Sequence, residues 1–166
     1  MREEVRLLRS SRKKLSAAIV AVAVSAAGAA VALGSPGLGF VPTNLVTGSM
    51  NNAVKWNSDR VKFQTKGPTD TRVQKIEIAP GGYSGWHHHP GVVIVTVATG
   101  AVTFTQSDCS STTYGPGLPA GSAFVEGGDD PGQASSTDGA TVYATFVAPH
   151  ANPPVFRIED DPPPCA

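Results

Sequence analysis

Short runs of alternating apolar and polar residues fill the chain from about residue 54 onward. Residues 72–78 follow a period of two, and Ala79-Pro80-Gly81-Gly82 then interrupts the pattern. Further strand-like runs cover residues 92–98, 101–105, 122–125 and 141–146. Short runs bounded by glycine and proline are typical of strands, and no segment after residue 50 has the 3.6-residue period of a useful helix. The pattern therefore predicts an all-β domain, either a sandwich or a barrel.

The N-terminal residues have the composition of a membrane-targeting segment. Residues 1–14 contain six Lys and Arg against two Glu, and residues 15–33 contain no charge and no proline. A helix of about 19 residues spans roughly 28 Å, close to the hydrocarbon thickness of a bilayer. A basic flank before an apolar run is what an export signal requires. We therefore predict that residues 1–34 are a signal peptide or a membrane anchor, with cleavage and retention both left open.

The remaining residues divide into a linker, one domain and a tail. Residues 34–48 are rich in Gly, Pro, Ser and Thr without periodicity, so we predict a flexible linker over residues 35–53. The strand-like runs place the folded domain at residues 54–158, followed by a proline-rich tail at residues 159–166. Beyond residue 14 the chain has seven basic and eleven acidic residues. No basic stripe remains, which argues against nucleic acid as a partner.

The two cysteines, Cys109 and Cys165, fit an extracytoplasmic location, in which the protein is secreted or anchored to the cell membrane. An even number of cysteines in an exported chain favours one disulfide. We predict that Cys109 and Cys165 form it and so fix the tail against the domain; two free thiols are the alternative.

Three consecutive histidines form the strongest chemical pattern in the chain. A period of two places His87 and His89 on one face of a strand, and Trp86 and His88 on the other. Two imidazoles on the inward face of a barrel can share a divalent metal ion such as Mn, Fe, Ni or Zn. The same parity turns residues 93, 95 and 97 inward, so the cavity beyond the histidines is expected to be apolar.

Residues 81–100 resemble the first motif of the cupin superfamily, in which a glycine precedes a His-x-His pair, a strand and a glycine turn. The matching residues are Gly81, His87, His89 and Gly100. Pro119-Ala120-Gly121 is similar to the opening of the second cupin motif. The resemblance covers roughly residues 54–158 and looks most like small exported single-domain cupins. It implies a cupin-type double-stranded β-helix, or jelly-roll barrel, here preceded by one N-terminal hydrophobic helix.

Two ligand positions of metal-binding cupins are changed in this chain. Such cupins place a glutamate about four residues after the second histidine, where this chain has Val93 and its neighbours, and a further histidine near the position of Gln133. An amide oxygen is a weak neutral donor, so the implied metal ligands shrink to His87, His89 and, secondarily, Gln133. Binding of a metal is left open; the alternative is a pocket in which the histidines form hydrogen bonds.

Other polar residues are weaker candidates for the site. His88 is expected at the surface or rim of the barrel, and His150 in a loop. Glu126, Asp129 and Asp130 form an acidic, glycine-rich turn that we interpret as a solvated loop. The alternative is that one of these carboxylates lies at the barrel mouth and replaces the missing ligand.

Two functions remain open from the sequence. The first is an exported binding module that holds a small molecule, with or without a divalent metal ion. Its pocket is expected to be lined by the histidine pair together with Tyr83, Trp86, Val93, Val95 and Val97. The second is a metal-dependent enzyme, dioxygenase-like or isomerase-like, as the resemblance implies. The reduced ligand set favours the first. A homodimer, and contact with a membrane through an uncleaved N-terminal segment, are also left open.

Overall fold

The computed structural model describes residues 36–164, and all regular secondary structure in this range is β-strand. The strands are β1 (Leu38–Met50), β2 (Lys55–Asn57), β3 (Lys62–Gln64), β4 (Thr69–Tyr83), β5 (His87–His88), β6 (Val92–Gly100), β7 (Val102–Gln106), β8 (Ser111–Tyr114), β9 (Ala123–Gly127), β10 (Gly132–Ser136), β11 (Ala140–Pro149) and β12 (Ile158–Glu159). The prediction of an all-β domain is therefore confirmed.

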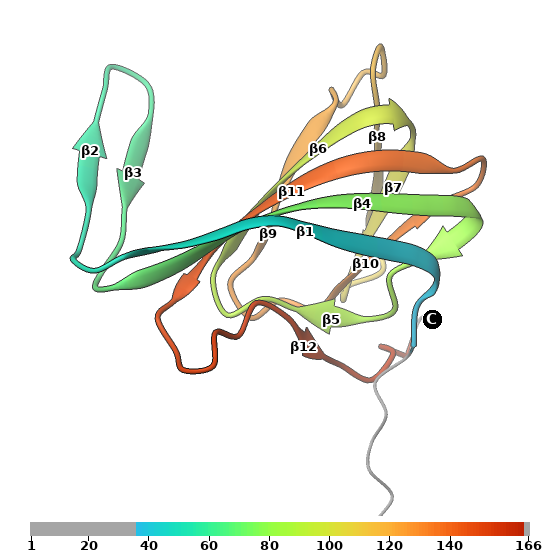
Figure 1. Ribbon diagram of the computed structural model, residues 1–166. Coiled ribbons are helices and arrows are strands. Elements are labelled where there is room, and N and C mark those ends of the chain that lie inside the picture. The colour runs from blue at the N-terminus through green and yellow to red at the C-terminus, as the bar shows by residue number, and fades with distance from the viewer. Residues whose placement is uncertain (1–35, 165–166) are drawn as a thin grey trace, which may run out of the picture.

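One antiparallel sheet of ten strands curls into a nearly closed barrel (Figure 1). Its main order is β12-β5-β10-β4-β11-β6-β9, with β1 also paired to β4, and β7 paired to both β10 and β8. The long strand β4 closes the curve, because its first part pairs with β11 while its last residue, Tyr83, pairs with Ser135 of β10. The interruption expected at residues 79–82 does not end this strand, which continues to Tyr83.

The core lies inside the barrel and follows the predicted alternation. Along β6, Val93, Val95 and Val97 are at most 5% exposed, whereas Val92 and Ile94 between and beside them are exposed. The same alternation runs along β11, whose buried residues face those of β6. Phe104, Phe124 and Tyr114 extend the core on the opposite wall by stacking their rings. Burial of these side chains supplies the main stabilisation of the barrel.

The expectation of a flexible linker over residues 35–53 is wrong for most of that segment. Strand β1 pairs with β4 from Leu38 to Met50, with two register shifts. Phe40 and Pro42 of this strand line the interior. Backbone pairing with a long neighbouring strand therefore outweighs the low strand propensity of its Gly and Pro residues.

A two-stranded hairpin, β2–β3, projects from the barrel between β1 and β4 (Figure 1). Trp56 and Phe63 form a cross-strand pair in it, and Trp56 is exposed. The hairpin lies at the end of the molecule away from the curled end of β4, and none of its residues lines the barrel cavity.

Several predictions concern residues outside the described range. The signal or anchor segment at residues 1–34 lies there, and so does Cys165, so its pairing with Cys109 stays a prediction. Among residues 36–164, no helix is long and apolar enough to span a membrane. The barrel itself extends beyond the predicted limits of 54 and 158. At the N-terminal side it includes β1, and at the C-terminal side Glu159 pairs with His87 while the backbone of Asp160 donates to the carbonyl oxygen of Trp86.

Candidate metal centre

The barrel encloses a cavity of about 550 Å³, and its lining is polar at one end and apolar at the other. Cross-strand neighbours form successive levels of inward-facing residues. The first level consists of Arg72, Phe146, Val93 and Glu126, and the second of Gln74, Ala144, Val95 and Phe124. Further levels contain only apolar side chains, among them Ile76, Ile78, Val142 and Val97. Charged and metal-ligating groups are therefore confined to one end.

Strand β5 and the residue that follows it bring His87 and His89 to the polar end of the cavity. Both side chains line the cavity and are only 5% exposed, and their rings meet edge to face with centroids 4.8 Å apart. Gly85 precedes them with a φ of +73°, a left-handed conformation that suits glycine, and its carbonyl oxygen turns toward the ring of His87. The prediction that these two histidines point into the barrel together is confirmed.

Backbone carbonyls orient both imidazole rings. Nδ1 of His87 donates to the carbonyl oxygen of Gly85 at 2.9 Å, and Nδ1 of His89 donates to that of Phe156. A proton held on Nδ1 leaves the lone pair on Nε2, the atom that would bind a metal. Burial, with a further contribution from the charge of Arg157, lowers the pKa of His87 to about 4. His87 is therefore neutral, and able to act as a ligand, over the physiological pH range.

Glu126 completes the cluster from the neighbouring strand β9. Its carboxylate Oε1 lies 3.6 Å from Nε2 of His89, and its side chain is 12% exposed. The residue directly opposite Glu126 on β6 is Val93, the region where a cupin glutamate was expected from the sequence. The next residue, Gly127, has a φ of +118°, and a Cβ there would lie 2.0 Å from the carbonyl oxygen of Gly91. This close approach holds the end of β9 against the histidine strand and places the carboxylate inside.

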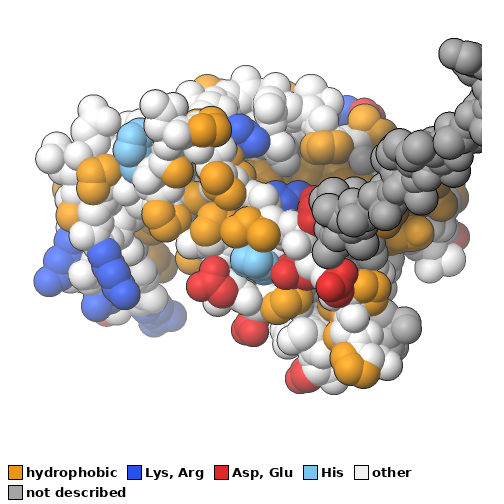
Figure 2. Space-filling model, turned by 90° about the horizontal axis from the view of Figure 1, so that it is seen from below, with side chains coloured by type: hydrophobic (Ala, Val, Ile, Leu, Met, Phe, Trp, Pro, Cys, Tyr) orange, Lys and Arg blue, Asp and Glu red, His pale blue; other side chains and the backbone are white. Residues whose placement is uncertain are grey.

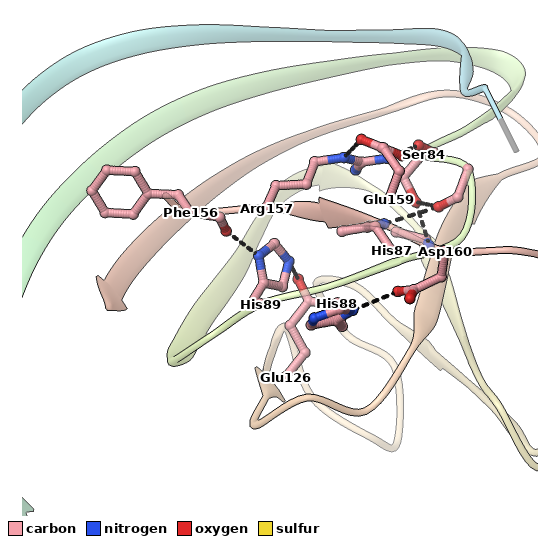
Figure 3. Close-up of polar contacts among 11 residues, drawn as sticks. Ser84, His87, His88, His89, Glu126, Phe156, Arg157, Glu159 and Asp160 are labelled. Carbon is pink, nitrogen blue, oxygen red and sulfur yellow. Dashed lines mark hydrogen bonds and ion pairs between the residues drawn. The ribbon is translucent and has the colours of Figure 1, made fainter. Parts of the chain in front are cut away.

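The three side chains fit a divalent metal ion. Their ligand atoms all lie within 4.8 Å of one another, and two ligands of one metal at about 2.1 Å each stand roughly 3–4 Å apart. A small rotation of the side chains closes the remaining difference. Nε2 of His89 is buried and has no hydrogen-bond partner, which is a costly state that a metal ion would relieve. Figure 3 shows His89 lying between the carbonyl of Phe156 and the carboxylate of Glu126.

Gln133, predicted as a secondary metal ligand, does not line the cavity, so the structure does not bring it together with His87 and His89. It lies on β10 beside Ala134, which lines the cavity and pairs with the buried Phe104. Adjacent residues of a strand point to opposite faces, so the amide of Gln133 faces away from the cavity. The signal that could have identified Glu126 instead was parity, since it lies two residues after Phe124, an aromatic residue suited to the core.

The predicted pocket residues are only partly correct. Val95 lines the cavity, while Val93 and Val97 are buried on the same face and pack in the core. Trp86 is buried and Tyr83 is half-buried, but neither lines the cavity. Period two holds along β6, whereas residues 83–86 form the bend between β4 and β5, where strand parity no longer applies.

Residues after the last predicted strand complete the cavity. Phe156 and Arg157, which come just before the predicted tail, lie in its wall. Arg157 forms an ion pair with Glu159 and donates to the carbonyl oxygen of Ser84 at 2.7 Å (Figure 3). The bond to Ser84 and the pairing of β12 with β5 hold the C-terminal segment against the histidine strand, and the hydrogen bond from Arg157 lowers the pKa of Glu159. The sequence had no periodic pattern there from which a wall could be predicted.

The other two histidines lie elsewhere. Nδ1 of His88 bonds to the carboxylate of Asp160 at 2.8 Å, on the other side of the strand from His87 and His89 (Figure 3). His150 bonds to Asp70 and does not line the cavity. Asp129 and Asp130 are exposed, so the solvated-loop interpretation is correct for them and wrong for Glu126.

Strand order, curvature and the inward His-x-His pair together define a cupin-type β-barrel, as the sequence motif predicted. No known protein-family profile matches the chain, and no curated protein matches it. Among solved structures, a conserved SPY1581 protein of unknown function from Streptococcus pyogenes is similar, with 17% identity and a TM-score of 0.46. The match covers 68% of this chain and 76% of that one.

Two further similar structures are enzymes. One reports the DMSP lyases RdDddP and RnDddQII, with 19% identity, a TM-score of 0.44, and coverage of 54% of this chain and 44% of that one. The other is salicylate 1,2-dioxygenase from Pseudoaminobacter salicylatoxidans in complex with gentisate, with 16% identity and a TM-score of 0.39. There the match covers 45% of this chain and 19% of the dioxygenase chain.

Proposed function

We propose that this protein binds one divalent transition-metal ion through His87, His89 and Glu126 and binds a small molecule beside that ion in the barrel cavity. The observation that carries the proposal is the buried Nε2 of His89, which faces the Glu126 carboxylate at 3.6 Å without a hydrogen bond. Two imidazoles and one carboxylate are a recurrent ligand set for zinc enzymes and for non-haem iron oxygenases, in which other coordination positions stay open.

The carboxylate changes the balance between the two functions considered from the sequence. Two histidines and a distant amide would hold a metal weakly and favoured a plain binding module. Glu126 adds a charged oxygen donor at the place opposite Val93. This supports a metal-dependent enzyme as the more specific form of the proposal. A bound ion would supply Lewis-acid activation of a ligand or water at its open positions.

The chain's own residues have three tasks in this proposal. Gly85 and Phe156 orient the imidazoles through their carbonyl oxygens. Phe146 packs its ring against His89 at 5.4 Å between centroids and keeps that side of the site apolar. Beyond it, the apolar levels of the cavity would hold the body of the ligand and exclude water from it.

A binding module without metal is the second candidate, and the apolar lining of most of the cavity favours it. In that case the histidines and Glu126 would meet polar groups of the ligand directly. Export of the protein, with its N-terminal segment cleaved or retained as an anchor, is part of the proposal in both forms. Cell fractionation tests it, and recovery of the chain in the cytosol would contradict it.

Calorimetric titration of the metal-stripped protein with Mn²⁺, Fe²⁺, Ni²⁺ and Zn²⁺ tests the metal centre. We expect one ion per chain for at least one of these metals, and Glu126→Gln should weaken binding about 10- to 100-fold. Gln133→Ala, which replaces a nearby polar residue outside the cavity, is the matched control and should leave the affinity unchanged. Absence of stoichiometric binding by the wild-type protein, or equal affinity of Glu126→Gln and wild type, would contradict the proposal.

A further inference from the structure

Arg72 is the cavity's one charged side chain, among the described residues, without an ion pair or hydrogen bond. It lies on the inward face of β4, at the same level as Phe146, Val93 and Glu126. Its guanidinium carbon lies 4.1 Å from the centre of the Phe156 ring, and its Nε is buried with no hydrogen-bond partner. Stacking on an aromatic ring satisfies the face of a guanidinium but none of its N–H donors.

The other charged groups near this end of the cavity have partners of their own, except Glu126, which belongs to the proposed metal cluster. Arg157 is paired with Glu159, and Asp70 accepts hydrogen bonds from Ser49, His150 and the backbone of Ala151. Glu126 faces His89. Arg72 therefore presents a positive charge without an ion pair, and a planar set of donors, to a cavity that is apolar over most of its length. This arrangement costs free energy unless an anion meets it.

We propose that Arg72 binds the carboxylate of a small, largely apolar carboxylic acid, whose body lies against the apolar levels of the cavity. A carboxylate matches the guanidinium because it can accept two parallel N–H hydrogen bonds. One free cation suits a monoanion, whereas a dianionic phosphate would require a second cation, and Arg157 is occupied. A small carboxylic acid is thus the substrate class that we assign to the proposed function. The contact of this ligand with the metal ion rests on that function, whereas its contact with Arg72 does not.

The position of Arg72 also places the ligand relative to the metal centre. The ring of Phe156 supports the guanidinium, while the carbonyl of the same residue orients His89. Phe146 pairs with Arg72 across the strands and packs its ring against both His89 and Phe156, so a carboxylate held by Arg72 lies beside the aromatic residues that border the metal cluster. Figure 2 shows hydrophobic side chains gathered around a recess on this face, with basic side chains visible among them.

Binding of 3-phenylpropanoate and of its neutral amide, 3-phenylpropanamide, tests the inference. The two probes share size and apolar surface and differ in charge. Titration is followed by protein NMR, in both metal-free and metal-loaded protein. We expect the wild-type protein to bind the carboxylate at least about 10-fold more tightly than the amide. Arg72→Met should abolish that preference while leaving amide binding unchanged, and Arg72→Lys should restore only part of it, because an ammonium lacks the planar fork.

Lys75→Met is the matched control, since it removes a positive charge from the outward face of the same strand. It should keep the preference for the carboxylate. Equal binding of the two probes by the wild type, no binding of the carboxylate, or an unchanged preference in a folded Arg72→Met protein would overturn the inference. Metal affinity measured on the same Arg72→Met protein should equal that of the wild type. If the wild type binds no metal but still selects the carboxylate through Arg72, the metal proposal fails and the carboxylate site stands.

Discussion

The pairs His150–Asp70 and His89–Glu126 each bring an imidazole to a carboxylate, and they differ in what the surrounding groups supply. At His150 and Asp70, Nδ1 of the imidazole donates to the carboxylate at 2.9 Å, and Ser49 and the backbone of Ala151 donate to the same carboxylate. At His89 and Glu126, the two groups stand 3.6 Å apart with no hydrogen bond between them.

This difference distinguishes a pair that only stabilises the fold, His150–Asp70, from a candidate metal-binding site at His89 and Glu126. The His150–Asp70 pair has its donors and acceptors matched, and its imidazole is half exposed to water. The hydrogen bond from Ser49, followed by that from His150, lowers the pKa of Asp70, so the carboxylate is ionised and fully bonded. At His89 the backbone has already used Nδ1, and the remaining nitrogen faces a carboxylate and a second imidazole. Unsatisfied buried groups that converge on one point indicate a missing ligand.

The largest expected effect is the loss of metal when a cavity histidine is removed. His89→Ala should weaken metal binding about a thousandfold or more, because it removes one of only three ligands. His150→Ala, the equivalent change at the structural pair, should leave metal affinity unchanged. Calorimetry measures both, with circular dichroism to verify folding. Equal metal affinity of His89→Ala and wild type would show that His89 is no more a metal ligand than His150.

The second effect concerns pH and the metal-free protein. The pKa of His87 is lowered from 6.5 to about 4, so the unfolded chain takes up a proton at higher pH than the folded one. The stability that this histidine contributes is therefore complete above pH 6.5 and falls by about 3 kcal/mol as the pH drops to 4. Urea unfolding between pH 7 and pH 4 measures it.

His87→Gln serves as the control for that pH dependence, because it removes the titrating group from the cavity and should remove this part of the slope. Asp70 contributes in the same direction but at lower pH, because its pKa is also lowered in the folded protein. Its lowered pKa gives stability that is present above the unfolded value and is lost only as the pH falls through the folded value. A wild-type slope identical to that of His87→Gln would show that His87 is not buried as a neutral group.

A smaller effect is expected from breaking the structural pair. Asp70→Asn keeps the size of the side chain but removes the charge that three donors share, and should lower the stability by less than the acid-induced loss at His87. Metal affinity should not change, since Asp70 is absent from the cluster of His87, His89 and Glu126. Denaturant unfolding and metal titration of one protein sample measure both quantities. Loss of metal binding in a folded Asp70→Asn protein would contradict this assignment.

The smallest effect concerns Gln133. Because it faces away from the cavity, Gln133→Ala should change metal affinity less than about twofold, where the sequence alone predicted partial weakening. A tenfold loss in the same titration would restore it as a ligand.

The sequence predicted the barrel well where apolar and polar residues alternate along a strand without interruption. Val93, Val95 and Val97 alternate without interruption, so their inward direction followed from parity, and the His-x-His pair lies on a strand that obeys the same rule. Strand β1 could not be predicted, because its Gly- and Pro-rich residues are held by pairing with β4 rather than by their own propensity.

The candidate site was predicted in part for a similar reason. His87 and His89 follow one another on a strand, whereas Glu126 and Arg72 reach them only through the register of other strands. Sequence spacing carries no information on which residues of different strands lie side by side. The carboxylate expected near Val93 on β6 is instead supplied by Glu126, directly opposite on β9, and the sequence alone therefore indicated that this ligand was missing. Phe156 and Arg157 were missed because their segment returns to the cavity only after the last long strand.

The central claim is that a metal ion belongs at His89 and Glu126 and not at His150 and Asp70. Anomalous diffraction at the absorption edge of the metal, from crystals of metal-loaded protein, tests it most directly. We expect one strong peak about 2.1 Å from Nε2 of His87, Nε2 of His89 and a carboxylate oxygen of Glu126. No peak in the cavity, or a peak at the His150–Asp70 pair instead, would contradict it.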